Sequence, residues 1–175
     1  MNFPNILSLS RIILLLPIIL LFENGFYYLC FSTFVVASIT DYLDGYLARK
    51  NNQTSDIGAL LDLLADILFV SILLVWMTFE FENKMILISS ILIISREISI
   101  SYLRLFIVSE TKKLNEVKSN LIGKFKTSIQ MIGLGFILIT PVTPNIILYF
   151  SLALIFFSAL ISWYSFIRYL NKWIV

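Results

Sequence analysis

The sequence predicts an all-α membrane protein whose single domain, residues 1–175, crosses the bilayer with six helices. Hydrophobic residues make up 59% of the chain and its mean hydropathy is +0.92, which exceeds the composition of a soluble globular domain. The apolar residues are also grouped in stretches close to the roughly 20 residues that a helix needs to cross a bilayer. We therefore expect a protein embedded in membrane lipid, with no nucleic acid as partner.

Six apolar stretches alternate with polar or turn-forming segments, and they lie at 12–22, 26–47, 57–79, 85–108, 121–140 and 146–169. The first stretch is expected to remain in the mature protein, because no small-residue cleavage site follows Leu21. The polar segments fall into two sets, and segments 49–56 and 109–120 are much more basic than the other three. This alternation is expected when successive polar segments emerge on opposite sides of a membrane.

The cations near the span ends predict the orientation of the chain. Lys84 stands alone on one side, and the other side carries Arg49, Lys50, Lys112, Lys113, Lys118, Lys124, Lys126, Arg168 and Lys172. Loops rich in Lys and Arg stay in the cytoplasm. We therefore expect an inner (cytoplasmic) membrane protein whose two termini, and the hairpin between its second and third spans, face the cytosol.

Four carboxylates flank that hairpin. Asp41 and Asp44 are three residues apart, and Asp62 and Asp66 are four apart, so each pair shares one face of its helix. The connecting segment is rich in turn and cap formers, which favours two helices that meet as a hairpin. The sequence thus predicts that four oxygen donors converge at the cytosolic end of the second and third helices.

A bound divalent cation explains how these acids can lie together. Bare carboxylates would raise one another's pKa and are costly to hold near lipid. The chain has no His and only Cys30 as a thiol, so the ligands favour the hard cations Mg²⁺ or Mn²⁺. The alternative is an ordinary solvated loop, but acids at paired helical spacing at a membrane edge favour a functional site. Gly45 and Gly58 would let a ligand approach closely, or could serve helix packing.

Written as a pattern, this region is D-x2-D-G-x2-A-R-x8-G-x3-D-x3-D, and it resembles the signature of the CDP-alcohol phosphotransferase family. All eight fixed positions are present: Asp41, Asp44, Gly45, Ala48, Arg49, Gly58, Asp62 and Asp66. The resemblance implies transfer of a phosphatidyl group from CDP-diacylglycerol to an alcohol, with release of CMP and help from two divalent ions. It also implies a homodimer as one expected assembly, because dimers are common in the family.

The resemblance further implies a role for each residue of the signature. All four acids would contribute to the metal site, Asp41, Asp44 and Asp62 chiefly as ligands and Asp66 also as the candidate catalytic base. The CDP moiety would bind at Asn5, Gly45, Ala48, Arg49 and Gly58. In that site Arg49 would clamp the diphosphate with its planar guanidinium.

The fourth and fifth spans carry cations that suggest an anion pocket. Arg96 and Arg104 are eight residues apart and lie nearly on one helical face, and Lys124 and Lys126 lie near the start of the fifth span, where backbone N–H groups also favour phosphate. Other interpretations stay open at this point. Arg104 could snorkel to the interface, Arg96 could pair with a neighbour of Glu97 or a signature Asp, and the lysines could anchor lipid headgroups.

Segments 96–104 and 122–131 resemble the phosphatidylglycerophosphate synthases within the larger family, which implies sn-glycerol 3-phosphate as acceptor. The opening PNILSLSR, residues 4–11, also resembles the P-N-x-x-T-x-x-R opening of bacterial members, with Ser8 where Thr is usual. The chain departs from the usual D-P-x-A-D-K pattern of such synthases, because it has Leu63 in place of Pro and Ile67 in place of Lys.

Two alternatives follow from these departures and from the acids themselves. A sibling transferase could use another acceptor, as cardiolipin synthases and phosphatidylinositol-phosphate synthases do. A divalent-cation transporter could also place acids on paired helices. Arg49 and the cations of the fourth and fifth spans argue against transport, because positive side chains would not help a cation to pass.

Overall fold

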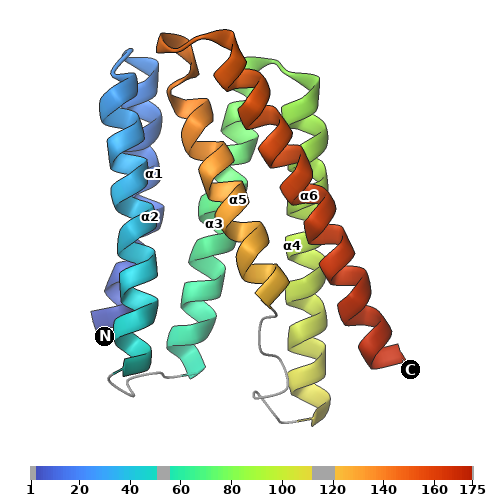
Figure 1. Ribbon diagram of the computed structural model, residues 1–175. Helices are drawn as coiled ribbons and strands as arrows, with labels where there is room; N and C mark the ends of the chain where they lie inside the picture. The colour runs from blue at the N-terminus through green and yellow to red at the C-terminus, as the bar shows by residue number, and fades with distance from the viewer. Residues whose placement is uncertain (1–2, 51–55, 112–120, 175) are drawn as a thin grey trace.

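The computed structural model is a bundle of long α-helices (Figure 1). It describes residues 3–50, 56–111 and 121–174, with side chains at 10–40, 63–103, 105–106 and 125–171. The helices are α1 (Phe3–Glu23), α2 (Tyr27–Lys50), α3 (Asp56–Phe81), α4 (Lys84–Thr111), α5 (Leu121–Leu138) and α6 (Asn145–Ile174), with the short 3-10 helix η2 (Thr140–Val142) before α6. Over the described ranges the chain is helical apart from its short turns, so the predicted all-α fold is confirmed.

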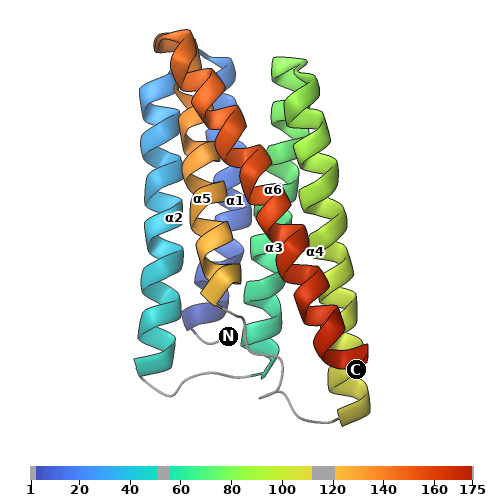
Figure 2. The same cartoon turned by 45° about the vertical axis from the view of Figure 1, so that its right-hand side comes forward.

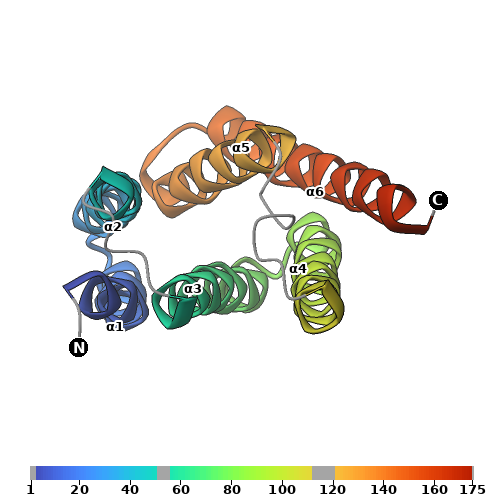
Figure 3. The ribbon, with the colours of Figure 1, turned by 90° about the horizontal axis from the view of Figure 1, so that it is seen from below.

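Successive helices run in opposite directions along the bundle (Figures 1 and 2). The end of α2, the start of α3, the end of α4, the start of α5 and both chain termini lie at the lower end in Figure 1, which we call the basal end. Helix α1 packs against both α2 and α3, while α6 packs against α4 and α5, as the view from below shows (Figure 3). The helix ends that flank segments 51–55 and 112–120 therefore lie at one end of the bundle.

The tight turns at the opposite end have clear local causes. Gly25 adopts φ +78°, which glycine alone adopts without strain, and the N–H groups of Gly25 and Phe26 donate to the carbonyls of Phe22 (2.9 Å) and Leu21 (2.8 Å). These two bonds form a Schellman motif that ends α1. Asn83 caps α4, because its Oδ1 accepts a hydrogen bond from the Met85 N–H at 2.8 Å.

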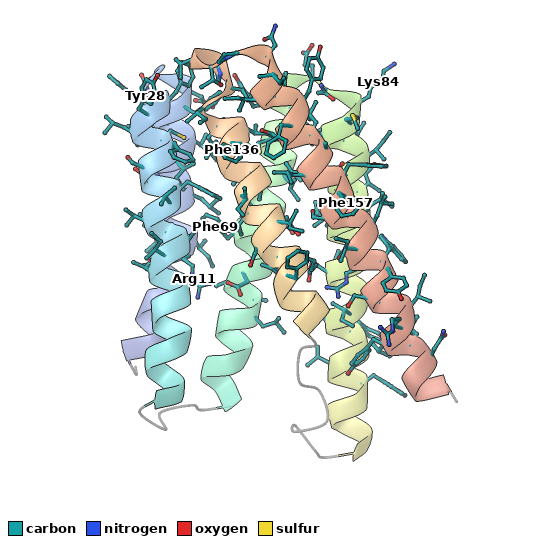
Figure 4. All side chains as sticks on the ribbon, in the orientation of Figure 1. Arg11, Tyr28, Phe69, Lys84, Phe136 and Phe157 are labelled. Carbon is teal, nitrogen blue, oxygen red and sulfur yellow. The ribbon has the colours of Figure 1, made fainter. Side chains whose placement is uncertain are left out.

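A continuous apolar core runs through the centre of the bundle. It includes Ile18 of α1, Phe34 of α2 and Phe69 of α3, and the last two rings stack with centroids 6.0 Å apart; Figure 4 labels Phe69. Helices α5 and α6 approach closely at Gly133, where an added Cβ would lie only 2.8 Å from a side-chain carbon of Ile155. Small residues permit such close helix contacts in membrane proteins.

The outside of the bundle is as apolar as its centre. Large hydrophobic side chains are exposed on every long helix, among them Phe79 at 82% and Phe157 at 56% (Figure 4). Within the described residues, Leu63–Phe81, Lys84–Leu103 and Asn145–Asn171 are long and apolar enough to cross a membrane, and Tyr27–Thr40 and Phe125–Leu138 are shorter apolar segments. The surface is that of a membrane protein, whereas the number of six crossings stays a prediction.

Candidate active site

The four signature acids lie on two helices at the basal end. Asp41 and Asp44 belong to the last three turns of α2, and Asp62 and Asp66 belong to the first three turns of α3. Among the described side chains, no three His, Cys, Asp or Glu residues gather around one point. Three of the four acids fall outside that set, so their convergence stays a prediction.

The nucleotide site also stays a prediction. Helices α1, α2 and α3 contain all of its predicted residues and bring them to the basal end, but their side chains lie outside the described part. These residues are Asn5, Gly45, Ala48, Arg49 and Gly58. Their helix assignments agree with the expected hairpin, whose connecting residues 51–55 are not described.

The side chain of Asp66 is described, and it is held by a residue that the sequence did not predict for the site. Arg11 of α1 donates from Nη1 to Oδ1 of Asp66 across 55 residues of sequence. Arg11 is only 4% exposed, whereas the side chain of Asp66 is 49% exposed. Figure 4 shows Arg11 in the lower half of the bundle. Its position as the last fixed residue of the opening 4–11, directly before the apolar stretch 12–22, was the signal that could have identified it.

The ligand types available at this end fit a hard divalent cation. Carboxylate oxygens are the donors that Mg²⁺ and Mn²⁺ prefer, and the chain has no His. The single thiol, Cys30, is buried and its Sγ donates to the carbonyl of Ile18 at 3.2 Å. The chemistry of the donors therefore leaves carboxylates as the side chains that could hold a metal.

A second polar cluster joins α4, α5 and α6. Glu97 Oε1 accepts hydrogen bonds from Arg96 Nη1 (3.1 Å) and from the ammonium group of Lys126. Both cations also bind Ser162 of α6. Arg96 Nε donates to its carbonyl and Lys126 Nζ to its hydroxyl, each at 3.2 Å. The Glu97 carboxylate thus links a cation of α4 to a cation of α5, and both cations also contact α6.

This cluster is largely buried. Arg96 is 5% exposed and Lys126 is 4% exposed, and among the described side chains these two cations share the carboxylate of Glu97. Lys126 therefore does not lie at the surface as an anchor for lipid headgroups. Arg96 pairs with Glu97 itself.

The structure brings together two of the four predicted phosphate-binding cations. Arg104 of α4 and Lys124 of α5 lie nearer the basal ends of their helices, but their side chains are not among those described. Glu97 and Ser162 were missed as members of the cluster. The adjacent pair Arg96-Glu97 was the available signal for Glu97, whereas no pattern in the sequence pointed to Ser162.

Comparison with known proteins identifies the family of the chain. Residues 1–163 match the family model described as CDP-alcohol phosphatidyltransferase. The chain belongs to this family. CDP-alcohol phosphatidyltransferases are enzymes that generally use divalent metal ions, in agreement with the donor chemistry described above. Membership in an enzyme family disfavours the cation-transporter alternative.

Individual members of the CDP-alcohol phosphatidyltransferase family resemble the chain over nearly its whole length. It is 36% identical over 174 residues to the CDP-diacylglycerol–glycerol-3-phosphate 3-phosphatidyltransferase of Shigella flexneri serotype 5b (strain 8401). The identity to the enzyme of the same name from Escherichia coli (strain K12) is also 36%. Both alignments cover 97% of this chain and 93% of the relative.

Proposed function

We propose that this protein transfers the phosphatidyl group of CDP-diacylglycerol to sn-glycerol 3-phosphate, giving phosphatidylglycerophosphate and CMP. The observation that carries the proposal is the 36% identity, over 97% of the chain, to transferases named for this reaction. The complete eight-residue signature supports the donor half of the reaction. The enzyme would act in phospholipid biosynthesis, on the route to phosphatidylglycerol.

The acids of α2 and α3 would bind the donor through divalent cations. In this proposal two Mg²⁺ or Mn²⁺ ions are held by Asp41, Asp44, Asp62 and Asp66. When bound, such ions neutralise the charge of the diphosphate. The neighbouring Arg49 would bind the diphosphate with its planar guanidinium. The CDP moiety would contact Asn5, and the small residues Gly45, Ala48 and Gly58 would leave room for it.

The remaining chemistry assigns one step to Asp66. A carboxylate oxygen of Asp66 takes the proton of the acceptor hydroxyl, whose oxygen attacks the phosphorus on the lipid side of the diphosphate. The bond from that phosphorus to the CMP oxygen then breaks, and CMP leaves with the electron pair. The half-exposed side chain of Asp66 supports this role, because a base must be reachable by the acceptor.

The cations of α4 and α5 would bind the acceptor phosphate. The proposed pocket contains four cationic side chains: Arg96, Arg104, Lys124 and Lys126. A phosphomonoester anion would offset their positive charge, whereas a neutral alcohol would not. Glycerol 3-phosphate therefore fits the pocket better than glycerol.

The same proposal extends to the placement of the protein. We take residues 1–175 as one transmembrane domain of the inner membrane, with the basal end and both termini in the cytosol. The nine cations on that side support this orientation through the positive-inside rule. Water-soluble glycerol 3-phosphate and metal ions would enter from the cytosol, and the donor would enter from the lipid. A homodimer is the assembly that we propose to test first.

An acceptor panel tests the proposal. Purified protein in lipid nanodiscs would receive CDP-diacylglycerol, Mg²⁺ and, separately, glycerol 3-phosphate, inositol phosphate, phosphatidylglycerol, glycerol or serine. We expect CMP release with glycerol 3-phosphate to exceed that with every other alcohol. Preferred use of phosphatidylglycerol or inositol phosphate would instead support a sibling transferase. Leu63 and Ile67, which depart from the usual D-P-x-A-D-K pattern, are the reason for including these acceptors.

A further inference from the structure

We propose that Arg11 is a positioning residue that orients the carboxylate of Asp66 for proton transfer. The inference rests on the proposed function, in which Asp66 takes the proton of the acceptor hydroxyl. Arg11 lies on α1, whereas the eight signature residues lie on α2 and α3. The contact joins the last residue of the opening 4–11 to the last acid of the signature.

The burial of Arg11 indicates that the pairing is specific. A buried guanidinium is costly unless it is paired and hydrogen-bonded, and Arg11 is 4% exposed within an apolar helix. It pairs with the carboxylate of Asp66 on α3, a helix against which α1 packs. The neighbouring core residues Leu15 and Ile18 of α1 are buried as well, so the backbone that carries Arg11 is fixed by packing.

The exposure of Asp66 indicates that the pairing leaves room for function. Its side chain is 49% exposed although Oδ1 is bound by a buried arginine. Full burial of the Asp66 carboxylate would add a desolvation cost and would keep an acceptor hydroxyl away from it. Here one side is anchored to the core and the other side is accessible, which suits a group that must meet a reacting hydroxyl in a fixed orientation.

The choice of arginine is also informative. The guanidinium is planar and donates along fixed directions, so it sets the orientation of a carboxylate, whereas a lysine ammonium acts as a point charge on a flexible stem. The positive charge of Arg11 also competes with a cation for Asp66. In the proposed site Asp66 therefore shares its carboxylate with Arg11, and the other three signature acids are the principal ligands.

The step that Arg11 supports can be written in full. The O–H bond of the acceptor breaks and its proton moves to a carboxylate oxygen of Asp66, while the acceptor oxygen bonds to the lipid-side phosphorus. The phosphorus–oxygen bond to CMP breaks, and its electron pair leaves with CMP. Arg11 takes no part in bond making and acts only through Asp66.

The test compares Arg11→Met and Arg11→Lys with wild type and with the control Lys84→Met. Lys84 is an exposed cation at the opposite end of the bundle (Figure 4). In nanodiscs containing CDP-diacylglycerol, we expect Arg11→Met to lower kcat by about 100-fold, the scale of general-base catalysis, with both KM values within about threefold of wild type. Arg11→Lys should recover about tenfold of that loss and stay about tenfold below wild type, because it restores the charge without the fixed geometry.

Melting temperature and thermal stabilisation by CDP-diacylglycerol provide readouts independent of turnover. The proposal is overturned if Arg11→Met keeps kcat near wild type. It is also overturned if kcat, donor binding and the melting temperature fall together while both KM values rise, which would make Arg11 a structural tie between α1 and α3. If Arg11→Met does not fold, Arg11→Lys decides: reduced kcat at unchanged KM and melting temperature supports positioning, and unchanged kcat refutes it. Failure of wild type to release CMP would refute the proposed function instead.

Discussion

Replacement of Lys126 by Met tests whether the buried cluster serves the acceptor. The change removes the ammonium group and keeps a long, flexible apolar side chain. Lys126 Nζ donates to Glu97 Oε1 and, at 3.2 Å, to Ser162 Oγ, and the replacement removes both contacts. Glu97 still accepts from Arg96 at 3.1 Å and is not left as an unpaired buried charge.

The magnitude follows from that remaining contact. Removing one partner of a buried ion pair costs about 3–5 kcal/mol when the other charge is left uncompensated. Because Arg96 continues to pair with Glu97, we expect a smaller loss of unfolding free energy, about 1–3 kcal/mol. A charge-assisted hydrogen bond to the acceptor phosphate contributes about 1.5–3 kcal/mol, so KM for glycerol 3-phosphate should rise about 10- to 100-fold.

The assay measures initial rates of CMP release while each substrate is varied in turn. KM for CDP-diacylglycerol should change less than about twofold, because the proposed donor site lies on α1, α2 and α3. Lys84→Met is the matched control and should leave both constants unchanged. Equal rises in the two KM values, or a fall in stability with no change in KM for glycerol 3-phosphate, would refute the acceptor role of Lys126.

Three further predictions address the metal site, the base and the helix packing. Replacing any one of the three principal ligand acids by Asn (Asp41, Asp44 or Asp62) should abolish turnover and weaken Mn²⁺ binding; near-native activity at matched protein level would remove the proposed site. Asp66→Asn should still bind CDP-diacylglycerol but barely turn over, whereas joint loss of metal and nucleotide binding would make Asp66 mainly a ligand. Gly133→Val should lower the unfolding free energy by about 1–3 kcal/mol, since even a Cβ there would lie 2.8 Å from an α6 side chain; an unchanged melting temperature would contradict this packing.

The helices could be predicted closely because apolar stretches and turn residues mark them directly. The break at residues 23–25 coincides with the Schellman turn at Gly25, and the break before residue 85 coincides with the cap at Asn83. The predicted ends were less accurate, since α4 continues to Thr111 and α1 begins at Phe3. A hydropathy pattern marks where a helix is apolar, whereas helical hydrogen bonding can continue into polar residues.

The site could be predicted only where its residues share one helix or one signature. The spacing of Asp62 and Asp66 was readable, but the partner of Asp66 lies 55 residues away on α1. Likewise, the eightfold spacing of Arg96 and Arg104 suggested a shared face, and the structure adds Glu97 as the group that links Arg96 to α5. Such contacts depend on how helices pack, and periodicity along one helix carries no information about that packing.

Following the acceptor into lipid tests whether this protein forms phosphatidylglycerophosphate. Purified wild-type protein would be incubated with CDP-diacylglycerol, Mg²⁺ and isotopically labelled glycerol 3-phosphate, with Asp44→Asn as the inactive control. We expect the label to appear in a lipid with the mass of phosphatidylglycerophosphate, together with an equimolar amount of CMP. Neither product should form with Asp44→Asn or in the presence of a chelator. Absence of labelled lipid from wild type, or the same yield from Asp44→Asn, would contradict the proposed function.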